Sequence, residues 1–233
     1  MRISGFQKLT LLDYPGHISA LIFTTGCNMR CPFCYNAEMV LPEKIAAYKH
    51  FIEEKEVLKV LQTRKDFLEG VVISGGEPTL QPDLRNFIIK IKGLGLKVKL
   101  DTNGLRPSIL EKLFKERLLD FVAMDIKASL EKYTEVANVP IDTKKIQKSI
   151  GLIMESGIDY EFRSTIIPKF HSAQEMEKMA RLIAGARHYA LQRFMPVHTL
   201  DPAMATEKPY SESEIKMFAT IAQKHVKKIE LRG

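Results

Sequence analysis

The stretch Cys27-Asn28-Met29-Arg30-Cys31-Pro32-Phe33-Cys34-Tyr35 contains all three cysteines of the 233-residue chain. Three residues separate the first two cysteines and two separate the last two, so one loop can present three thiolates to a single polynuclear iron centre. In a centre of four irons, one iron would then lack a thiolate. An open coordination position can take a substrate or cofactor, so the spacing indicates a metal centre with a chemical role.

Two simpler interpretations stay open for the segment by itself. A zinc site of three cysteines and one histidine could use His17 or His50, because short cysteine runs also bind zinc. The three thiols could also be buried packing groups without a metal. The residues outside the segment favour the iron centre.

The composition is that of an ordinary globular chain, with 45% hydrophobic and 27% charged residues. The length suits one α/β core, so we expect a single domain over residues 1–233. An odd, clustered set of cysteines is typical of a reducing compartment. The start of the sequence has no apolar signal region, and the longest apolar stretch, at residues 18–23, is too short to span a bilayer. We therefore expect a cytoplasmic protein that does not enter membranes.

The formal net charge is +7, which favours an acidic protein surface, a nucleotide or a nucleic acid as partner without choosing among them. The lysines are scattered over predicted helix faces, and no aromatic platform of the kind that single-stranded nucleic acid needs is interleaved with them. Nucleic acid is therefore not the expected partner.

Apolar strand patterns and helical patterns alternate along most of the chain. Strands are predicted at 18–25, 71–73, 96–100, 121–126, 160–167, 189–195 and 228–231, and helices at 53–65, 83–92, 107–117, 143–156, 174–184 and from a capping box at Ser211 onward. Strict alternation with short connections predicts parallel βα units. About six such units are too few to close the usual eightfold barrel.

The predicted fold is therefore a partial, laterally open (β/α)6 barrel over residues 17–233, and residues 1–16 are predicted to form an N-terminal hairpin beside it. A doubly wound sheet is the alternative. In either fold, the loops at the carboxyl ends of the strands build the active site.

Unusual residues follow several of the predicted strands. Gly75, Gly76 and Glu77 lie in a Gly-Gly-Glu-Pro segment, which by itself could be only a turn. Asp101 opens Asp-Thr-Asn-Gly, which could be an Asx turn, and shares a strand face with Lys99. The remaining candidates are Asp125 and Lys127, which could form a surface ion pair, Arg163, which needs a partner if buried, and His198.

Together these segments resemble the radical S-adenosylmethionine (SAM) superfamily, in its branch of glycyl-radical-enzyme activating proteins. The resemblance covers most of the chain: Pro15-Gly16, the cysteine loop through Asn36, Gly-Gly-Glu, Asp-Thr-Asn-Gly, Asp-x-Lys, Arg163 before Pro168, and His198. The stretch from Gly5 to Gly16 resembles a subgroup of anaerobic ribonucleoside-triphosphate reductase activating proteins. Tyr35 is a departure, because these activases often have histidine there.

The resemblance implies a radical SAM barrel in which Cys27, Cys31 and Cys34 hold a 4Fe-4S cluster, and S-adenosyl-L-methionine chelates the fourth iron. It also implies the SAM contacts: the segment from Phe33 to Tyr35, the backbone of Gly75 and Gly76 in a turn shaped by Glu77, and the side chains of Asp101, Asp125, Lys127, Arg163 and His198. No side-chain acid or base is expected to be catalytic beyond the cluster and SAM.

The reaction that this resemblance implies is reductive cleavage of SAM, followed by removal of a hydrogen atom from a glycine Cα of a partner enzyme. The expected partners are a glycyl-radical enzyme and an electron donor of the flavodoxin or ferredoxin type. Anaerobic ribonucleoside-triphosphate reductase is the first choice of partner, and a pyruvate formate-lyase-type enzyme is the second. Alternatives are a radical SAM enzyme acting on a small molecule or nucleotide, and an iron-sulfur electron carrier without turnover.

Overall fold

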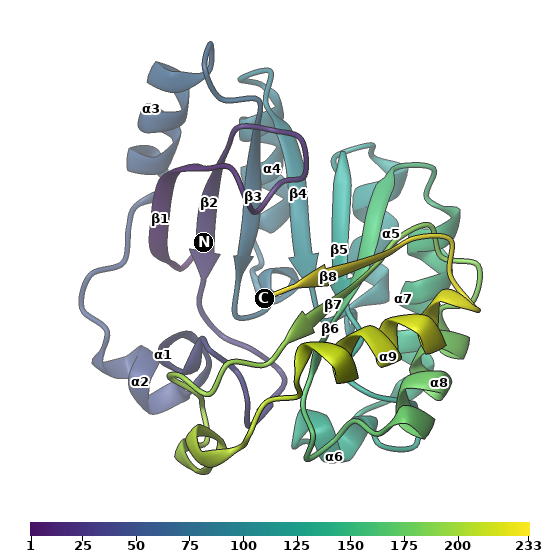
Figure 1. The fold of residues 1–233 in the computed structure, drawn as a ribbon. Coiled ribbons are helices and arrows are strands. Elements are labelled where there is room, and N and C mark those ends of the chain that lie inside the picture. Colours follow the sequence, from purple (N-terminus) through teal and green to yellow (C-terminus); the bar gives the residue numbers. More distant parts are fainter.

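The computed structural model describes all residues from Met1 to Gly233 and contains one sheet whose eight strands lie in chain order (Figure 1). The strands are β1 (Ile3–Thr10), β2 (Ser19–Thr24), β3 (Gly70–Gly75), β4 (Lys97–Thr102), β5 (Phe121–Asp125), β6 (Asp159–Ile166), β7 (Tyr189–Arg193) and β8 (Ile229–Arg232). The seven strands from β2 to β8 are parallel, and β1 is antiparallel to β2. Because β1 and β8 do not pair, the curved sheet stays open at its side, and the predicted partial barrel is confirmed.

The helices follow the strands in βα order, as the alternation predicted. They are α1 (Ala37–Val40), α2 (Pro42–Ala47), α3 (Glu54–Arg64), α4 (Leu84–Lys92), α5 (Pro107–Lys115), α6 (Tyr133–Ala137), α7 (Thr143–Glu155), α8 (Ala173–Leu182) and α9 (Glu212–Gln223), with short 3-10 turns at Pro78–Leu80 and Pro202–Thr206. The capping box predicted at Ser211 is present, with Glu214 as its partner. None of the helices combines the length and the apolar character needed to cross a bilayer.

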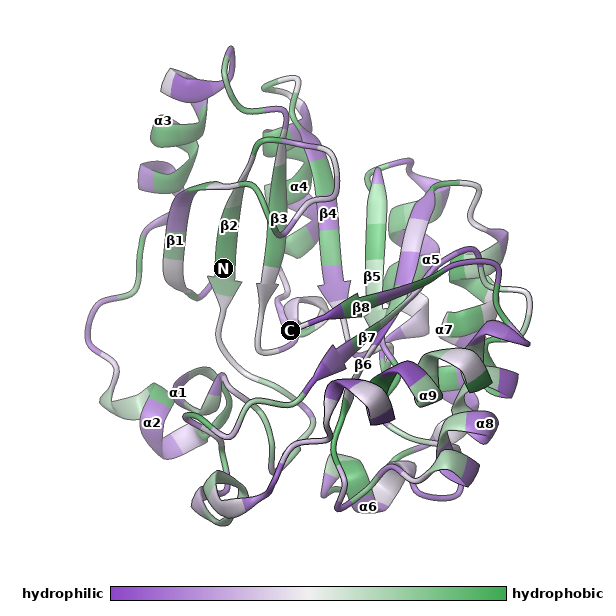
Figure 2. Cartoon of the chain, in the orientation of Figure 1, coloured by the Kyte–Doolittle hydropathy of each residue, from purple (hydrophilic) through white to green (hydrophobic).

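The longer helices cover the outer face of the sheet, and the main hydrophobic core lies between the two layers (Figure 1). Strands β2 and β3 are apolar on both faces, as is usual for parallel strands that are covered on both sides (Figure 2). On β2, Ala20 and Ile22 belong to the main core, whereas Leu21 points to the inner face. The helices therefore cover the outer face of the sheet, and its inner face is left for the site.

The amino-terminal part of the inner face is closed by the loop between β1 and β2. Tyr14 from this loop is buried against Phe121, with the ring centroids 5.8 Å apart, and joins Leu21 and Val72 in a small apolar cluster. An added Cβ at Gly70 would lie only 2.8 Å from the Tyr14 ring. The N-terminal segment therefore plugs one end of the barrel.

The N-terminal hairpin differs from the prediction in its bounds. Residues 1–16 do not form a hairpin of their own: they contribute one strand, β1, and β2 is the other strand of the pair. The turn residues Asp13, Pro15 and Gly16 interrupt the apolar pattern, and they lie in a loop and not in a second strand. The short helices α1, α2 and α6 were also not predicted, because helices of four to six residues depend on tertiary contacts more than on local propensity.

Candidate functional site

A cavity of about 370 Å³ opens at the carboxyl ends of the strands, on the inner side of the sheet. It is lined by residues from the cysteine loop and from the ends of β3, β4, β5 and β6. The predicted site residues that line it are Cys27, Cys31, Phe33, Cys34, Tyr35, Gly75, Gly76, Asp101, Asp125, Lys127 and Arg163. The fold therefore brings together predicted residues from segments that are far apart in the sequence.

The cysteine loop follows β2 directly and begins at Gly26, whose φ of +91° favours glycine. Backbone N–H groups point at two of the sulfurs: Met29 N donates to Cys27 Sγ and Asn36 N donates to Cys34 Sγ, each at 3.4 Å. Burial raises the pKa of Cys27 to about 11 and that of Cys31 to about 12. A metal must therefore displace the thiol protons when it binds.

Gly75 and Gly76 lie against the start of the cysteine loop and leave no room for side chains. Gly75 has a φ of +114°, and a Cβ on it would lie 2.4 Å from the backbone N and O of Thr24. A Cβ on Gly76 would lie 2.2 Å from the carbonyl oxygen of Gly26. Both glycines are thus required by the close approach of two backbones at the cavity wall.

Glu77 does not line the cavity, because its carboxylate is fully buried behind the wall. It accepts hydrogen bonds from Asn103 N at 2.6 Å, from Thr102 Oγ1 at 2.9 Å and from both the N–H and the hydroxyl of Thr79. Burial raises its pKa, and these bonds oppose that shift. Glu77 therefore holds the turn after β3 against the end of β4.

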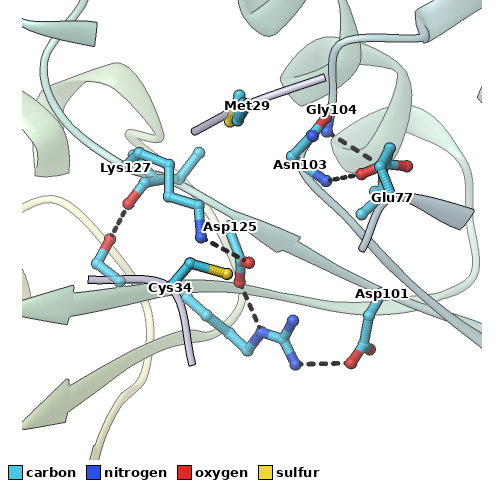
Figure 3. Close-up of polar contacts among 12 residues, drawn as sticks. Met29, Cys34, Glu77, Asp101, Asn103, Gly104, Asp125 and Lys127 are labelled. Carbon is cyan, nitrogen blue, oxygen red and sulfur yellow. Dashed lines mark hydrogen bonds and ion pairs between the residues drawn. The ribbon is translucent and has the colours of Figure 1, made fainter. Parts of the chain in front are cut away.

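Charged side chains from β4, β5 and β6 form a connected network across the cavity (Figure 3). Arg163 Nη1 donates to Asp101 Oδ2 at 3.1 Å, and Arg163 Nε donates to Asp125 Oδ1 at 3.0 Å. Lys127 Nζ binds the other oxygen of Asp125 at 2.9 Å, and Lys99 Nζ binds Asp101 at 2.6 Å. The partly buried charge at Arg163 thus has the partners that it needs.

The network keeps both aspartates ionised. Burial alone would raise the pKa of each carboxyl group, but Arg163 lowers both, with Lys99 acting on Asp101 and Lys127 on Asp125. The net result is a pKa below the ordinary value for each aspartate. The cavity wall therefore presents fixed charges of both signs, and the predicted Asp125–Lys127 pair is a part of the site instead of an isolated surface pair.

The sequence matches the family model of the radical SAM superfamily over residues 21–183, which span the cysteine loop and β2 to β6. The chain belongs to the radical SAM superfamily. One relative is a protein of Methanocaldococcus jannaschii with the provisional name glycyl-radical enzyme activating enzyme. It is 35% identical to this chain, and the match covers 99% of this chain and 95% of the relative's length. The pyruvate formate-lyase-activating enzyme of Clostridium pasteurianum is 29% identical over 85% of this chain and 83% of its own. Within the superfamily, the chain belongs to the glycyl-radical-enzyme activating branch.

Several solved structures share the fold. The Streptococcus suis protein SuiB, bound to its precursor peptide SuiA, aligns with a TM-score of 0.71 at 16% identity, over 91% of this chain and 48% of SuiB. The present chain thus spans about half the length of SuiB. This likeness confirms the open α/β barrel that the alternation of strands and helices predicted.

Radical SAM proteins bind a 4Fe-4S cluster and SAM, and the residues of this cavity fit both. All three cysteines are free thiols that line the cavity. A polynuclear centre fits that arrangement, because each thiolate would bind a different iron. His17 is one of the two histidines that could have completed a zinc site. Its ring packs against Tyr14 in the loop between β1 and β2, with 4.6 Å between the ring centroids, and not against the cysteines.

The aromatic residues of the cysteine loop connect it to the rest of the radical SAM site. The Lys127 ammonium lies 5.8 Å from the centroid of the Phe33 ring, and Phe33 also packs against Phe170. The Tyr35 ring is stacked on Phe194, and its hydroxyl accepts a hydrogen bond from Met195 N at 2.9 Å. Tyr35 thus pins the chain that leaves β7 against the cysteine loop.

His198 is the one predicted SAM contact that lies on the surface and outside the cavity lining. It belongs to an exposed segment, residues 195–198, which is anchored at both sides to the cysteine loop. On one side Met195 N binds the Tyr35 hydroxyl, and on the other Leu200 N donates to Cys34 O at 2.9 Å. Next to it, Asp201 N donates a hydrogen bond to Pro32 O, also at 2.9 Å. The SAM contact of His198 stays a prediction.

His171 is a buried residue of the site region that the sequence did not single out. Its Nδ1 accepts from Ile167 N at 3.0 Å, and its Nε2 lies 2.9 Å from the carbonyl oxygen of Lys127. Burial lowers the pKa of His171, so the neutral ring donates to Lys127 O. No local pattern marks this histidine, because its partner is a backbone group 44 positions away.

Proposed function

We propose that this protein is an activating enzyme that cleaves SAM reductively at a 4Fe-4S cluster and generates a glycyl radical on a partner enzyme. The observation that carries this proposal is one cavity that joins the three free thiols, the Gly75-Gly76 backbone and the charged network of β4, β5 and β6. An electron carrier without turnover has no use for such a network beside its cluster. Each part of the cavity has a role in the proposal.

Cys27, Cys31 and Cys34 would hold the cluster, and the fourth iron would be left for the methionine end of SAM. The amino acid part of SAM carries an amino group and a carboxylate. Gly75 and Gly76 line the cavity, and their backbone suits the amino group. Lys127 and Arg163 are cations at the cavity wall that can balance a carboxylate, while Asp125 and Asp101 keep them in place.

When bound, the reduced cluster and SAM supply the one-electron chemistry that removes a hydrogen atom from a glycine Cα. The residues of the chain bind and orient SAM and exclude water from the cavity. Phe33, which is 4% exposed, lines the cavity with its apolar ring. No side chain is assigned as a catalytic acid or base.

The proposed substrate is a glycine-bearing segment of a glycyl-radical enzyme. The unpaired edges β1 and β8 leave the barrel open at its side, where an extended segment could enter. Two relatives support this class of partner: one has the provisional name glycyl-radical enzyme activating enzyme, and the other is a pyruvate formate-lyase-activating enzyme. As the partner enzyme we propose anaerobic ribonucleoside-triphosphate reductase first, because the stretch from Gly5 to Gly16 resembles activating proteins of that enzyme. A pyruvate formate-lyase-type enzyme is the second choice.

The proposed electron donor is a flavodoxin or ferredoxin. Such a donor delivers one electron at a time, and the formal charge of +7 on this chain favours an acidic partner surface. Association with such a donor should weaken as the salt concentration rises.

The test combines the reduced, anaerobically reconstituted protein, SAM and each candidate partner, with electron paramagnetic resonance (EPR) as the readout. We expect a glycyl radical on one partner and an equal amount of 5′-deoxyadenosine. A partner whose radical glycine is replaced by alanine is the control and should give no radical. Efficient SAM-dependent conversion of a free small molecule, with no radical on any glycyl-radical partner, would overturn the proposal.

A further inference from the structure

The Arg30 side chain folds back onto the backbone of the cysteine loop. Its Nη1 donates to the carbonyl oxygens of Cys27 and Met29, each at 2.7 Å. Its backbone N–H donates to Ala137 O, at the end of α6, at 2.8 Å. The guanidinium is therefore anchored to the segment that connects the first two cysteines.

The charge of Arg30 is not neutralised by a carboxylate. Lys127, a cation whose charge acts on all three cysteines, is paired with Asp125 at 2.9 Å. Arg30 forms no such ion pair, and its side-chain contacts are the two carbonyl oxygens. Glu77, the buried carboxylate that acts on Cys27, makes its hydrogen bonds to Thr79, Thr102 and Asn103. One positive charge is thus held directly against the loop.

We propose that Arg30 tunes the reduction potential of the iron-sulfur cluster by stabilising its reduced form. This inference rests on the cluster of the proposed function. Reduction transfers one electron from a donor of the flavodoxin or ferredoxin class to the cluster, so the donor is oxidised by one electron and the cluster gains one negative charge. A fixed positive charge beside the loop favours the more negative state, and net charge near a cluster is one of the factors that set its potential.

The hydrogen bonds of Arg30 hold its guanidinium at one position on the cysteine loop. Two short hydrogen bonds to neighbouring carbonyl groups fix the guanidinium more closely than a free surface lysine would be fixed. The same contacts stiffen the loop, so a purely structural role has to be separated from an electrostatic one. Substitutions that keep or remove the charge make that separation.

The experiment measures the midpoint potential of the reconstituted cluster by EPR at a series of poised potentials, without SAM and without a partner enzyme. Arg30→Gln keeps a hydrogen-bond donor but removes the charge, and we expect a more negative potential than in the wild type. Arg30→Lys keeps the charge and should stay close to the wild type. Lys59→Gln is the matched control, because it removes one exposed charge from α3, far from the cysteine loop (Figure 1), and should leave the potential unchanged.

Iron and sulfide content is measured on every variant first. An unchanged potential in Arg30→Gln with full iron content would overturn the proposal, and so would equal shifts in Arg30→Gln and Arg30→Lys. Loss of the cluster in Arg30→Gln but not in Arg30→Lys would assign Arg30 to loop assembly and would also overturn it. A wild-type protein without an iron-sulfur cluster would refute the proposed function itself, whereas failure to activate a partner leaves this measurement intact.

Discussion

Asp125 on β5 and Arg163 on β6 stand directly opposite each other in the parallel register, and their side chains form a 3.0 Å ion pair inside the barrel. The same guanidinium reaches Asp101 on β4, so one arginine links three strands at the wall of the cavity. Because these charges are largely shielded from water, each depends on its partners for compensation. Removing one of them should therefore affect ligand binding more than a surface substitution would.

Asp125→Ala should weaken SAM binding by about 1 to 3 kcal/mol, because a shielded hydrogen-bond partner is removed while Lys127 and Arg163 remain. Iron content should stay at the wild-type level, since Asp125 is not a cluster ligand in the proposal. Equilibrium binding of SAM to the reconstituted protein measures the effect. Asp66→Ala, at an exposed position outside the site, is the control. Unchanged affinity in Asp125→Ala would remove this residue from the SAM site.

His198→Ala should also weaken SAM binding, if His198 contacts the bound cofactor as the resemblance implies. The exposed segment 195–198 is tied to the cysteine loop next to Tyr35, so it lies within reach of the cavity mouth. The same binding measurement applies, with iron content as the control. Wild-type affinity would show that His198 belongs to the outer surface.

Anaerobically reconstituted protein should hold about four irons and four sulfides per chain, because three thiolates suffice for one cubane and no cysteine remains for a second. Alanine in place of Cys27, Cys31 or Cys34 should abolish the cluster. Metal and sulfide analysis of protein prepared without oxygen checks both statements. One zinc ion per chain with no iron uptake would contradict them.

Gly76→Ala should destabilise the protein by about 1 to 3 kcal/mol, the usual range for overpacking, because its Cβ would lie 2.2 Å from a backbone oxygen. Gly151→Ala is the matched control: its Cβ meets no atom within 4 Å, and it lies inside α7. That change should stabilise the helix by roughly 0.5 to 1 kcal/mol. Urea unfolding of both variants measures the difference, and equal effects would show that the contact between Gly76 and Gly26 is not tight.

The stability of the protein should fall as the pH drops from about 6.5 to about 5.5, through His171. The buried ring has a pKa below its ordinary value, so the unfolded chain takes up a proton at His171 that the folded chain does not. The stabilisation is therefore complete above about pH 6.5, the unfolded value, and is lost as the pH falls toward the folded value. Urea midpoints across this range should vary less in His171→Gln than in the wild type. An identical pH dependence in the two proteins would contradict this assignment.

Much of the fold followed from the sequence. Alternation of apolar strands and helical segments predicted the βα units and the open barrel, because each element carries its own periodicity. The cysteine spacing and the Gly-Gly-Glu-Pro segment predicted where the cavity would form. Both glycines prove necessary for a backbone contact at the cavity wall.

Only the tertiary structure decided how these groups combine. The alternation of side chains along a strand shows that Lys99 and Asp101 share a face, but it cannot show that Arg163, 62 positions after Asp101, reaches both aspartates. That contact depends on the pairing of β4, β5 and β6 as neighbours in the sheet. The same holds for the burial of Glu77 behind the wall, the placement of His198 at the surface and the contact of His171 with Lys127. Local patterns fix the elements and their faces, whereas pairing between distant elements is fixed by packing of the whole chain.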